Sequence, residues 1–168
     1  MATLSREMVI QQFMFKAKKD REIRNGSDEG FQSALILSCC WISFEAFTCL
    51  TYQINGVWER IKKFCNDFSD RYSEWFDKSP DDFRRDVTNL KKYPISDMRP
   101  GHGHVDPISI SDEKKLENVL EVVYRIRCNL IHGGKNVKDD IDAEIIRLSS
   151  GVIYYILDHF LREEGFNW

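Results

Sequence analysis

The chain has 168 residues, and its 24 lysines and arginines are outnumbered by 27 aspartates and glutamates, which gives a formal net charge of -3. This length predicts a single domain over residues 1–168 that can bury a core without a disulfide or a structural metal. The charge balance excludes a general electrostatic binder of nucleic acid, because nonspecific binding depends on many contacts from lysine and arginine to phosphate. No DNA partner is therefore predicted, whereas a local site for one phosphate is compatible with the charge.

The cysteines indicate a reducing compartment. There are five, an odd number, and none falls into a C-x-x-C pair or a zinc-ligand spacing: Cys39, Cys40, Cys49, Cys65 and Cys128. This usage predicts reduced thiols in a cytoplasmic protein. Three of them lie in one apolar run, where we expect small core residues rather than nucleophiles. The first seven residues lack the apolar core of a signal peptide.

Two long helices are predicted at the start of the chain. Residues 3–24 repeat apolar side chains at helical spacing and gather basic residues at the end that the helix dipole favours. Residues 29–53 are apolar nearly all round, which is typical of a helix at the centre of a bundle or between its own core and a partner subunit. The run Ala34 to Leu50 is at the short limit for a membrane span and contains Glu45. We therefore expect a buried helix and no membrane partner.

Glu45 is the unusual residue of this helix. A carboxylate rarely lies on such an apolar surface unless it is paired. We expect an ion pair with an arginine of another helix, and a direct catalytic role is the alternative.

The middle of the chain predicts one long helix and one short helix. Residues 57–75 keep apolar side chains at helical spacing, and a short helix to about residue 91 follows Ser79, its expected cap. Residues 94–107 form a long irregular stretch that contains His102 and His104. This pair can contact a metal ion, but no Cys, Asp or Glu arrangement completes a ligand set, so no metal site is predicted. We expect the stretch to border the functional site.

Two further helices complete the chain. One begins at Ser109 or Ser111, either of which can cap it, and ends at the pair Gly133-Gly134. The last runs over residues 139–163. Since no strand pair or internal repeat is present, the predicted fold class is all-α, an antiparallel up-and-down bundle of four to five helices.

Functional residues are concentrated between Tyr124 and Lys135. This stretch carries two arginines, then a histidine in the last turn of the helix, and then the glycine pair. An arginine can grip phosphate oxygens in a bidentate manner, and a histidine can transfer a proton near neutral pH. These are the groups that phosphate chemistry without a metal or cofactor requires.

Within this stretch, Ile126-Arg127-Cys128-Asn129-Leu130-Ile131-His132-Gly133 resembles the signature of the HEPN superfamily, in which an arginine, four to six residues and a histidine close one helix of a helical bundle. The resemblance implies a homodimer of four- or five-helix bundles that cleaves RNA without a metal, with two copies of the motif facing each other. It also implies a toxin or effector of a toxin–antitoxin, abortive-infection or other antiphage system, with an antitoxin or another defence protein as partner.

The resemblance assigns roles to individual residues. His132 is the candidate for proton transfer and Arg127 for stabilising charge on the phosphoryl group. Asn129 lies three residues before His132 on the same face, where it can orient the substrate or the histidine. Lys135 is a further supporting candidate, and Glu45 is a candidate partner of Arg127.

Helix geometry complicates the choice of arginine. At 100° per residue, Arg125 and His132 project about 20° apart, whereas Arg127 lies about 140° from His132 and near the apolar stripe of the helix. The alignment with the motif favours Arg127 for catalysis and keeps Arg125 as a phosphate contact.

Two other interpretations are open. In a catalytically inactive HEPN-like bundle, which binds a partner protein, a nucleotide or RNA without cutting it, His132 is an ordinary helix-end residue and Arg127 forms a structural ion pair with Glu45. A helical adaptor unrelated to HEPN is the third interpretation. The sequence does not select an RNA target among tRNA, mRNA and invading transcripts.

Overall fold

The computed structural model describes residues 5–22, 29–97, 106–133 and 135–168. Within these ranges the regular structure is six helices and one isolated β-bridge. The helices are α1 (Arg6–Glu22), α2 (Glu29–Tyr52), α3 (Val57–Phe76), α4 (Asp81–Leu90), α5 (Leu116–Ile131) and α6 (Asp140–Glu163). The prediction of an all-helical fold is confirmed. Each of the six helices, including the short α4, lies where a helix was expected, whereas the expected bundle of four to five helices counted fewer.

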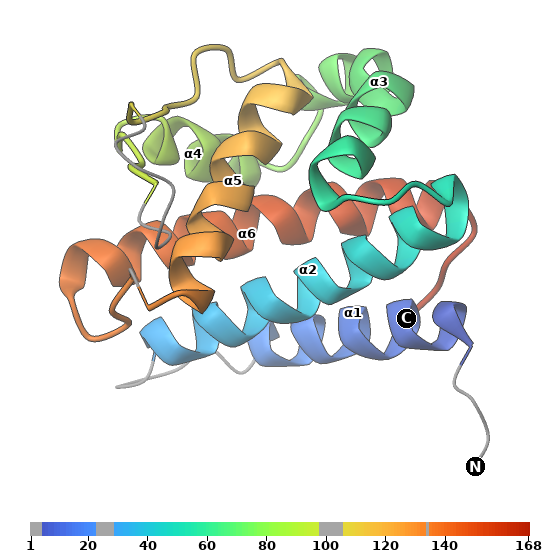
Figure 1. Ribbon diagram of the computed structural model, residues 1–168, viewed down its shortest axis with the longest axis horizontal. Helices are drawn as coiled ribbons and strands as arrows, with labels where there is room; N and C mark the ends of the chain where they lie inside the picture. The colour runs from blue at the N-terminus through green and yellow to red at the C-terminus, as the bar shows by residue number, and fades with distance from the viewer. Residues whose placement is uncertain (1–4, 23–28, 98–105, 134) are drawn as a thin grey trace.

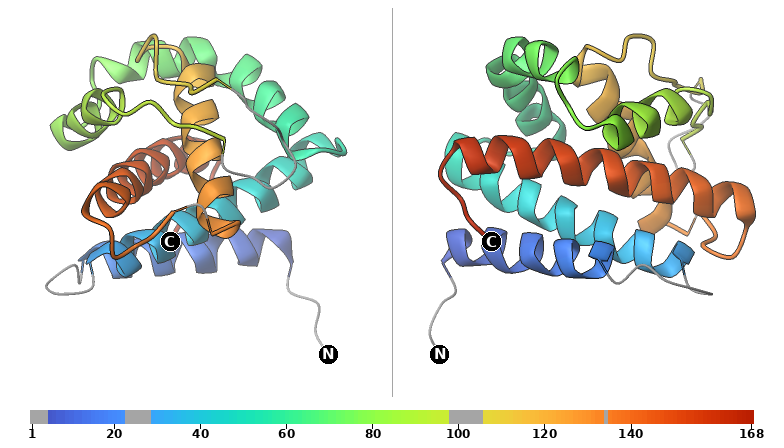
Figure 2. Two further views of the ribbon diagram at one scale, coloured as in Figure 1. Left: turned by 60° about the vertical axis from the view of Figure 1, so that its left-hand side comes forward. Right: turned by 180° about the vertical axis from the view of Figure 1, so that it is seen from behind.

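Three of the helices lie roughly alongside one another. α1 packs on α2, and α2 packs on α6, which runs in the same direction as α2 (Figure 1). α5 crosses α2 and α6 steeply, and α3 and α4 lie on the side of α6 where α5 begins (Figures 1 and 2). This arrangement brings the end of α5 down to the first half of α2.

α2 occupies the centre, as its composition predicts. Its side chains Trp41 and Phe44 are fully buried, and aromatic residues of α3 and α6 continue the same core. In the described part of the chain, α2 is the helix long and apolar enough to cross a membrane, and half of its apolar window is buried inside this fold. Four of the five thiols are buried, and burial raises the pKa of Cys65 to about 12. Buried, protonated thiols are poor nucleophiles.

The caps of α4 and α5 differ from the predicted ones. Ser79 donates its hydroxyl to the carbonyl of Phe76, at 2.7 Å, and so completes the end of α3 instead of capping α4. Ser111 donates to Asn118 at 2.7 Å, and α5 begins later, at Leu116, without a side-chain cap. The expectations for Ser79 and for Ser109 or Ser111 were therefore wrong, because α4 and α5 begin later in the chain and the cap positions fall on Pro80 and Lys115.

The irregular stretch after α4 is closed at its base. Ile95 and Ile108 form an antiparallel bridge, with N–H to carbonyl oxygen distances of 2.7 and 3.0 Å. Ile95 is buried in the core, so the bridge is fixed to the helices beneath it. His102 and His104 lie outside the described residues.

Gly151 of α6 provides a test of the close packing between α4 and α6. A Cβ atom there would lie 2.3 Å from Oδ2 of Asp86. This aspartate is buried, and its Oδ1 lies 3.5 Å from Nη1 of Arg147. We expect Gly151→Ala to lower the free energy of unfolding by about 1–2 kcal/mol, because overpacking costs more than helix propensity gains. Urea denaturation measures this loss.

The control is the same substitution in an Asp86→Ala background. There the carboxylate is absent, so Gly151→Ala should cost much less. An equal loss in both backgrounds would show that Asp86 is not the obstacle.

Candidate functional site

The C-terminal end of α5 presents His132 to solvent. The helix ends at Ile131, and the backbone N–H of His132 still donates to the carbonyl of Cys128, at 3.0 Å. Gly133 then adopts φ +74°, a conformation that glycine tolerates best, and the chain leaves the helix axis. The exposed imidazole thus stands at the negative end of the helix dipole.

Arg127 is held against α2 by the expected ion pair. Its Nη2 lies 3.5 Å from Oε1 of Glu45, and the same oxygen accepts a hydrogen bond from Nε1 of Trp41 at 2.6 Å. The guanidinium carbon lies 5.8 Å from the centre of the Trp41 ring. The prediction that Glu45 pairs with an arginine of another helix is confirmed.

This ion pair engages only some of the hydrogen-bond donors of the Arg127 guanidinium. The contact with Glu45 is single and long rather than bidentate, and Nε of Arg127 has no hydrogen-bond partner among the residues that the structure describes. The side chain is 25 % exposed. The Nε atom is itself buried, so it is the terminal nitrogens of Arg127 that can contact an anion while Glu45 holds the group in place.

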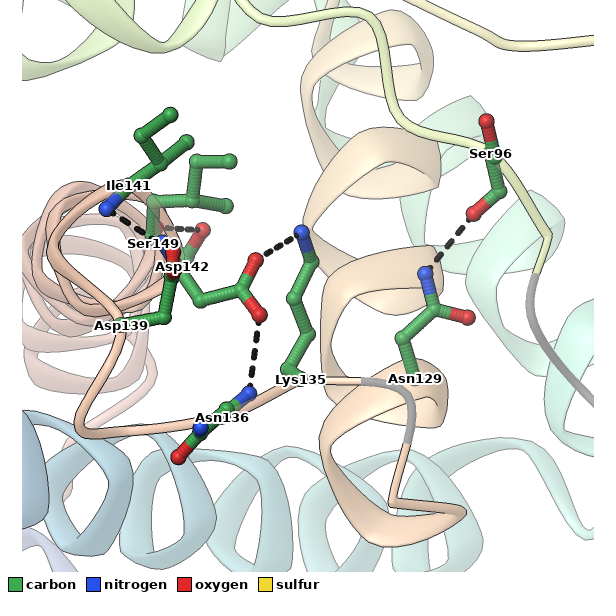
Figure 3. A network of polar contacts seen from close by, with 9 residues as sticks. Ser96, Asn129, Lys135, Asn136, Asp139, Ile141, Asp142 and Ser149 are labelled. Atoms are coloured by element: carbon green, nitrogen blue, oxygen red, sulfur yellow. Dashed lines mark hydrogen bonds and ion pairs between the residues drawn. The ribbon is translucent and has the colours of Figure 1, made fainter.

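Asn129 and Arg125 bind backbone carbonyls on either side of the irregular stretch. The Asn129 side chain, fully buried, donates from Nδ2 to the carbonyl of Ser96 at 2.7 Å (Figure 3). Arg125 donates from Nη1 to the carbonyl of Asp106 at 3.1 Å. The two residues are one turn apart on α5, so one face of this helix holds both stems of the segment closed by the bridge at Ile95. Asn129 is thereby out of contact with solvent.

Lys135 anchors the turn after α5 to α6. Its Nζ lies 2.5 Å from Oδ1 of Asp142, and the side chain is only 11 % exposed (Figure 3). Asn136 donates its N–H to the same carboxylate at 2.8 Å, and Asp139 caps α6 through the N–H groups of Ile141 and Asp142. In this arrangement the ammonium group points between α5 and α6 rather than outward.

A second cluster, around His159 of α6, was not indicated by the sequence pattern. The imidazole stacks on Trp75 of α3, with ring centres 4.6 Å apart and planes at 8°. Its Nε2 lies 3.5 Å from Glu163, and Arg71 and Asp158 are the other charges near it. Two pockets, of about 410 and 220 Å³, are both lined by His159, Trp75 and Glu163. Only the contact between α3 and α6 brings these residues together, and that contact has no sequence signal.

Metal ligands do not gather in the described part of the chain. No group of three or more His, Cys, Asp or Glu side chains there is placed to hold a metal ion. The pair His102 and His104 falls outside the described ranges, as noted above.

Asn129 and His132 should respond differently to truncation. Asn129→Ala removes a fully buried hydrogen bond, and we expect the free energy of unfolding to fall by about 1–3 kcal/mol. His132→Ala removes an exposed side chain and should change it by less than about 0.5 kcal/mol. Urea denaturation of the two variants makes the comparison, and similar losses would contradict this division of roles.

His159 should contribute to the pH dependence of stability. Burial lowers the pKa of His159 below its usual value of 6.5, partly opposed by Glu163. The unfolded chain therefore binds more protons, and the stability contributed by the neutral imidazole is present above pH 6.5 and lost as the pH falls below it. We expect the free energy of unfolding to fall less between pH 7.5 and pH 5.5 in His159→Gln than in the wild type. Parallel curves for the two proteins would refute the assignment.

Comparisons with known proteins provide no family assignment. No family model, no curated protein and no solved structure matches this chain. The resemblance to the HEPN superfamily therefore depends on residues 126–133, on their place at the end of α5, and on the all-helical fold.

Proposed function

We propose that the protein is a metal-independent endoribonuclease of the HEPN type. The observation that carries the proposal is the state of the two motif residues at the end of α5. His132 is exposed beside a glycine break, and Arg127 is oriented by Glu45 while its side chain remains 25 % exposed. A free proton-transfer group and a pre-oriented cation on one helix are what RNA cleavage without a metal needs.

The reaction uses the ribose 2′-hydroxyl as nucleophile. Its oxygen attacks the adjacent phosphorus while the bond to the 5′-oxygen of the next nucleotide breaks, leaving a 2′,3′-cyclic phosphate and a 5′-hydroxyl. His132 takes the proton of the nucleophile or protonates the leaving oxygen. Arg127 stabilises the charge that develops on the phosphoryl oxygens.

A second copy of the chain would complete the site. Five residues along a helix correspond to about 140°, so Arg127 and His132 of one chain leave α5 in different directions. Two apolar side chains lie one turn from the Arg127–Glu45 pair, Ile131 at 56 % and Ile42 at 40 % exposure. A homodimer of such helical bundles would cover them and place the two motifs across one cleft.

The resemblance also supplies the biological setting. We propose a cytoplasmic toxin or effector of a toxin–antitoxin or antiphage defence system, acting on RNA and controlled by an antitoxin or another protein of that system. No part of this setting depends on a cofactor.

The alternative is a HEPN-like bundle that binds a partner protein, a nucleotide or RNA without cutting it. It is favoured by the contacts of Arg127, since the ion pair with Glu45 and the packing near Trp41 are roles that a purely structural arginine would have. Cleavage and binding measurements separate the two functions.

The test is cleavage of a single-stranded RNA oligonucleotide in EDTA. We expect the wild type to cut it, and His132→Ala and Arg127→Ala to lower the rate about 100-fold or more, the usual contribution of such groups. A substrate with a 2′-deoxy sugar at the cut position should resist cleavage. Lys138→Ala, an exposed lysine in the turn before α6, is the matched control and should cut like the wild type.

The other outcomes are equally informative. RNA binding without cleavage by the wild type would establish the inactive bundle. Loss of cleavage in Arg125→Ala but not in Arg127→Ala would move the catalytic role to Arg125. Mixing the inactive His132→Ala and Arg127→Ala proteins should restore part of the activity if each site takes one residue from each chain, whereas a strict monomer in light scattering would exclude a shared cleft.

A further inference from the structure

A pocket of about 290 Å³ lies between the first turn of α3 and the middle of α5. It is lined by Trp58, Glu121, Tyr124 and Arg125. None of these four is a residue of the Arg127–His132 pair, and only Arg125 was singled out by the sequence motif. The volume is at the small end of the range for ligand sites, which suits one nucleotide rather than a long segment of a chain.

The apolar part of the pocket is aromatic. Tyr124 stacks between Trp41 and Trp58, at ring-centre distances of 5.4 and 6.0 Å and interplanar angles of 29° and 25°. Trp41 is buried and fixes this series to the core, whereas Trp58 and Tyr124 are half-buried and border the pocket. Because Tyr124 is covered by these two rings, Trp58 is the ring left for a base to stack on, which is the usual way in which proteins hold a nucleic acid base, and Tyr124 borders the pocket beside it.

The polar part of the pocket is a cation and a carboxylate one turn apart. The hydrogen bond from Arg125 to the Asp106 carbonyl fixes the guanidinium and uses one of its five donors. Glu121 makes no hydrogen bond or ion pair with any residue that the structure describes. The oxygens of a carboxylate accept hydrogen bonds, so a ligand in this pocket that presents N–H donors would be matched to Glu121.

We propose that this pocket binds a single guanine nucleotide of an RNA strand. The base lies against Trp58 and Tyr124, and its phosphate contacts Arg125. Guanine presents two neighbouring N–H donors on its pairing edge, which match the two oxygens of Glu121, whereas adenine and uracil present no such pair. Nucleotide binding is inferred from the geometry of the pocket alone. Only the identification of the nucleotide as part of an RNA substrate rests on the proposed function.

The position on α5 relates the pocket to the candidate cleavage site. Arg125 and His132 are seven residues apart, which is about 10 Å along a helix and about 20° around it. The pocket is therefore on the side of α5 from which His132 projects. A guanine held there selects a nucleotide near the cut rather than taking part in the reaction.

The test is the affinity of the purified protein for small probes, measured by isothermal titration calorimetry. We expect GMP to bind at least tenfold more tightly than AMP, UMP, guanosine or inorganic phosphate.

Trp58→Leu should weaken GMP binding about tenfold, the usual effect of losing one stacked base. Glu121→Gln should weaken GMP about tenfold and leave AMP unchanged, since only the guanine edge needs both carboxylate oxygens. Glu117→Gln, an exposed carboxylate one turn earlier on α5, is the matched control and should bind GMP like the wild type.

The proposal fails if GMP binds no better than inorganic phosphate, or if Trp58→Leu and Glu121→Gln both bind it like the wild type. Equal affinities for GMP and AMP that Glu121→Gln lowers together would overturn the guanine assignment. Because Glu121 is partly exposed, its variant remains usable even where Trp58→Leu does not fold. If the wild type binds GMP but cuts no RNA, the nucleotide pocket is supported and the proposed ribonuclease activity is refuted. If it cuts RNA but does not bind GMP, the ribonuclease activity is supported and the nucleotide pocket is refuted.

Discussion

The burial of α2 is the constraint on which the rest of this structure depends. A helix that is apolar nearly all round has to be covered from several directions, and α1, α6, α3 and α5 each cover part of it. Glu45 is the exception within that helix, and its carboxylate has to meet a cation where it emerges. α5 crosses α2 steeply (Figure 1), and its Arg127 pairs with Glu45. The packing of α5 on the core therefore also places the arginine of the motif.

α5 serves a different purpose on each of its sides. One side carries Arg127 toward α2, and another carries Arg125 and Asn129 toward the stems of the irregular segment. The end of the helix carries His132 into solvent. A motif that is continuous in sequence is thus divided in space, and the residues with the most buried contacts are the ones least able to touch a substrate.

The sequence could predict what depends on one helix at a time. The positions of the helices follow from apolar periodicity, and the partner of Glu45 follows from the cost of an unpaired carboxylate in an apolar helix. Contacts to backbone carbonyls could not be predicted, because every residue offers the same acceptor and nothing marks Ser96 or Asp106 as the one used. The pocket at Trp58 could not be predicted for a related reason. It is formed by residues of α3 and α5 that are about sixty positions apart in the sequence and come together only when the two helices pack.

The bridge between Ile95 and Ile108 bears on how this chain can vary. Asn129 and Arg125 of α5 bind the carbonyls of Ser96 and Asp106 on the two sides of this connection. The number of residues between these two points should therefore have little effect on the stability of the helices. Doubling such a connection costs only about 0.6 kcal/mol of closure entropy. Related chains could therefore carry longer or shorter inserts here, and the same position is a natural place to introduce a reporter peptide or to exchange segments between homologues while the helical frame is kept.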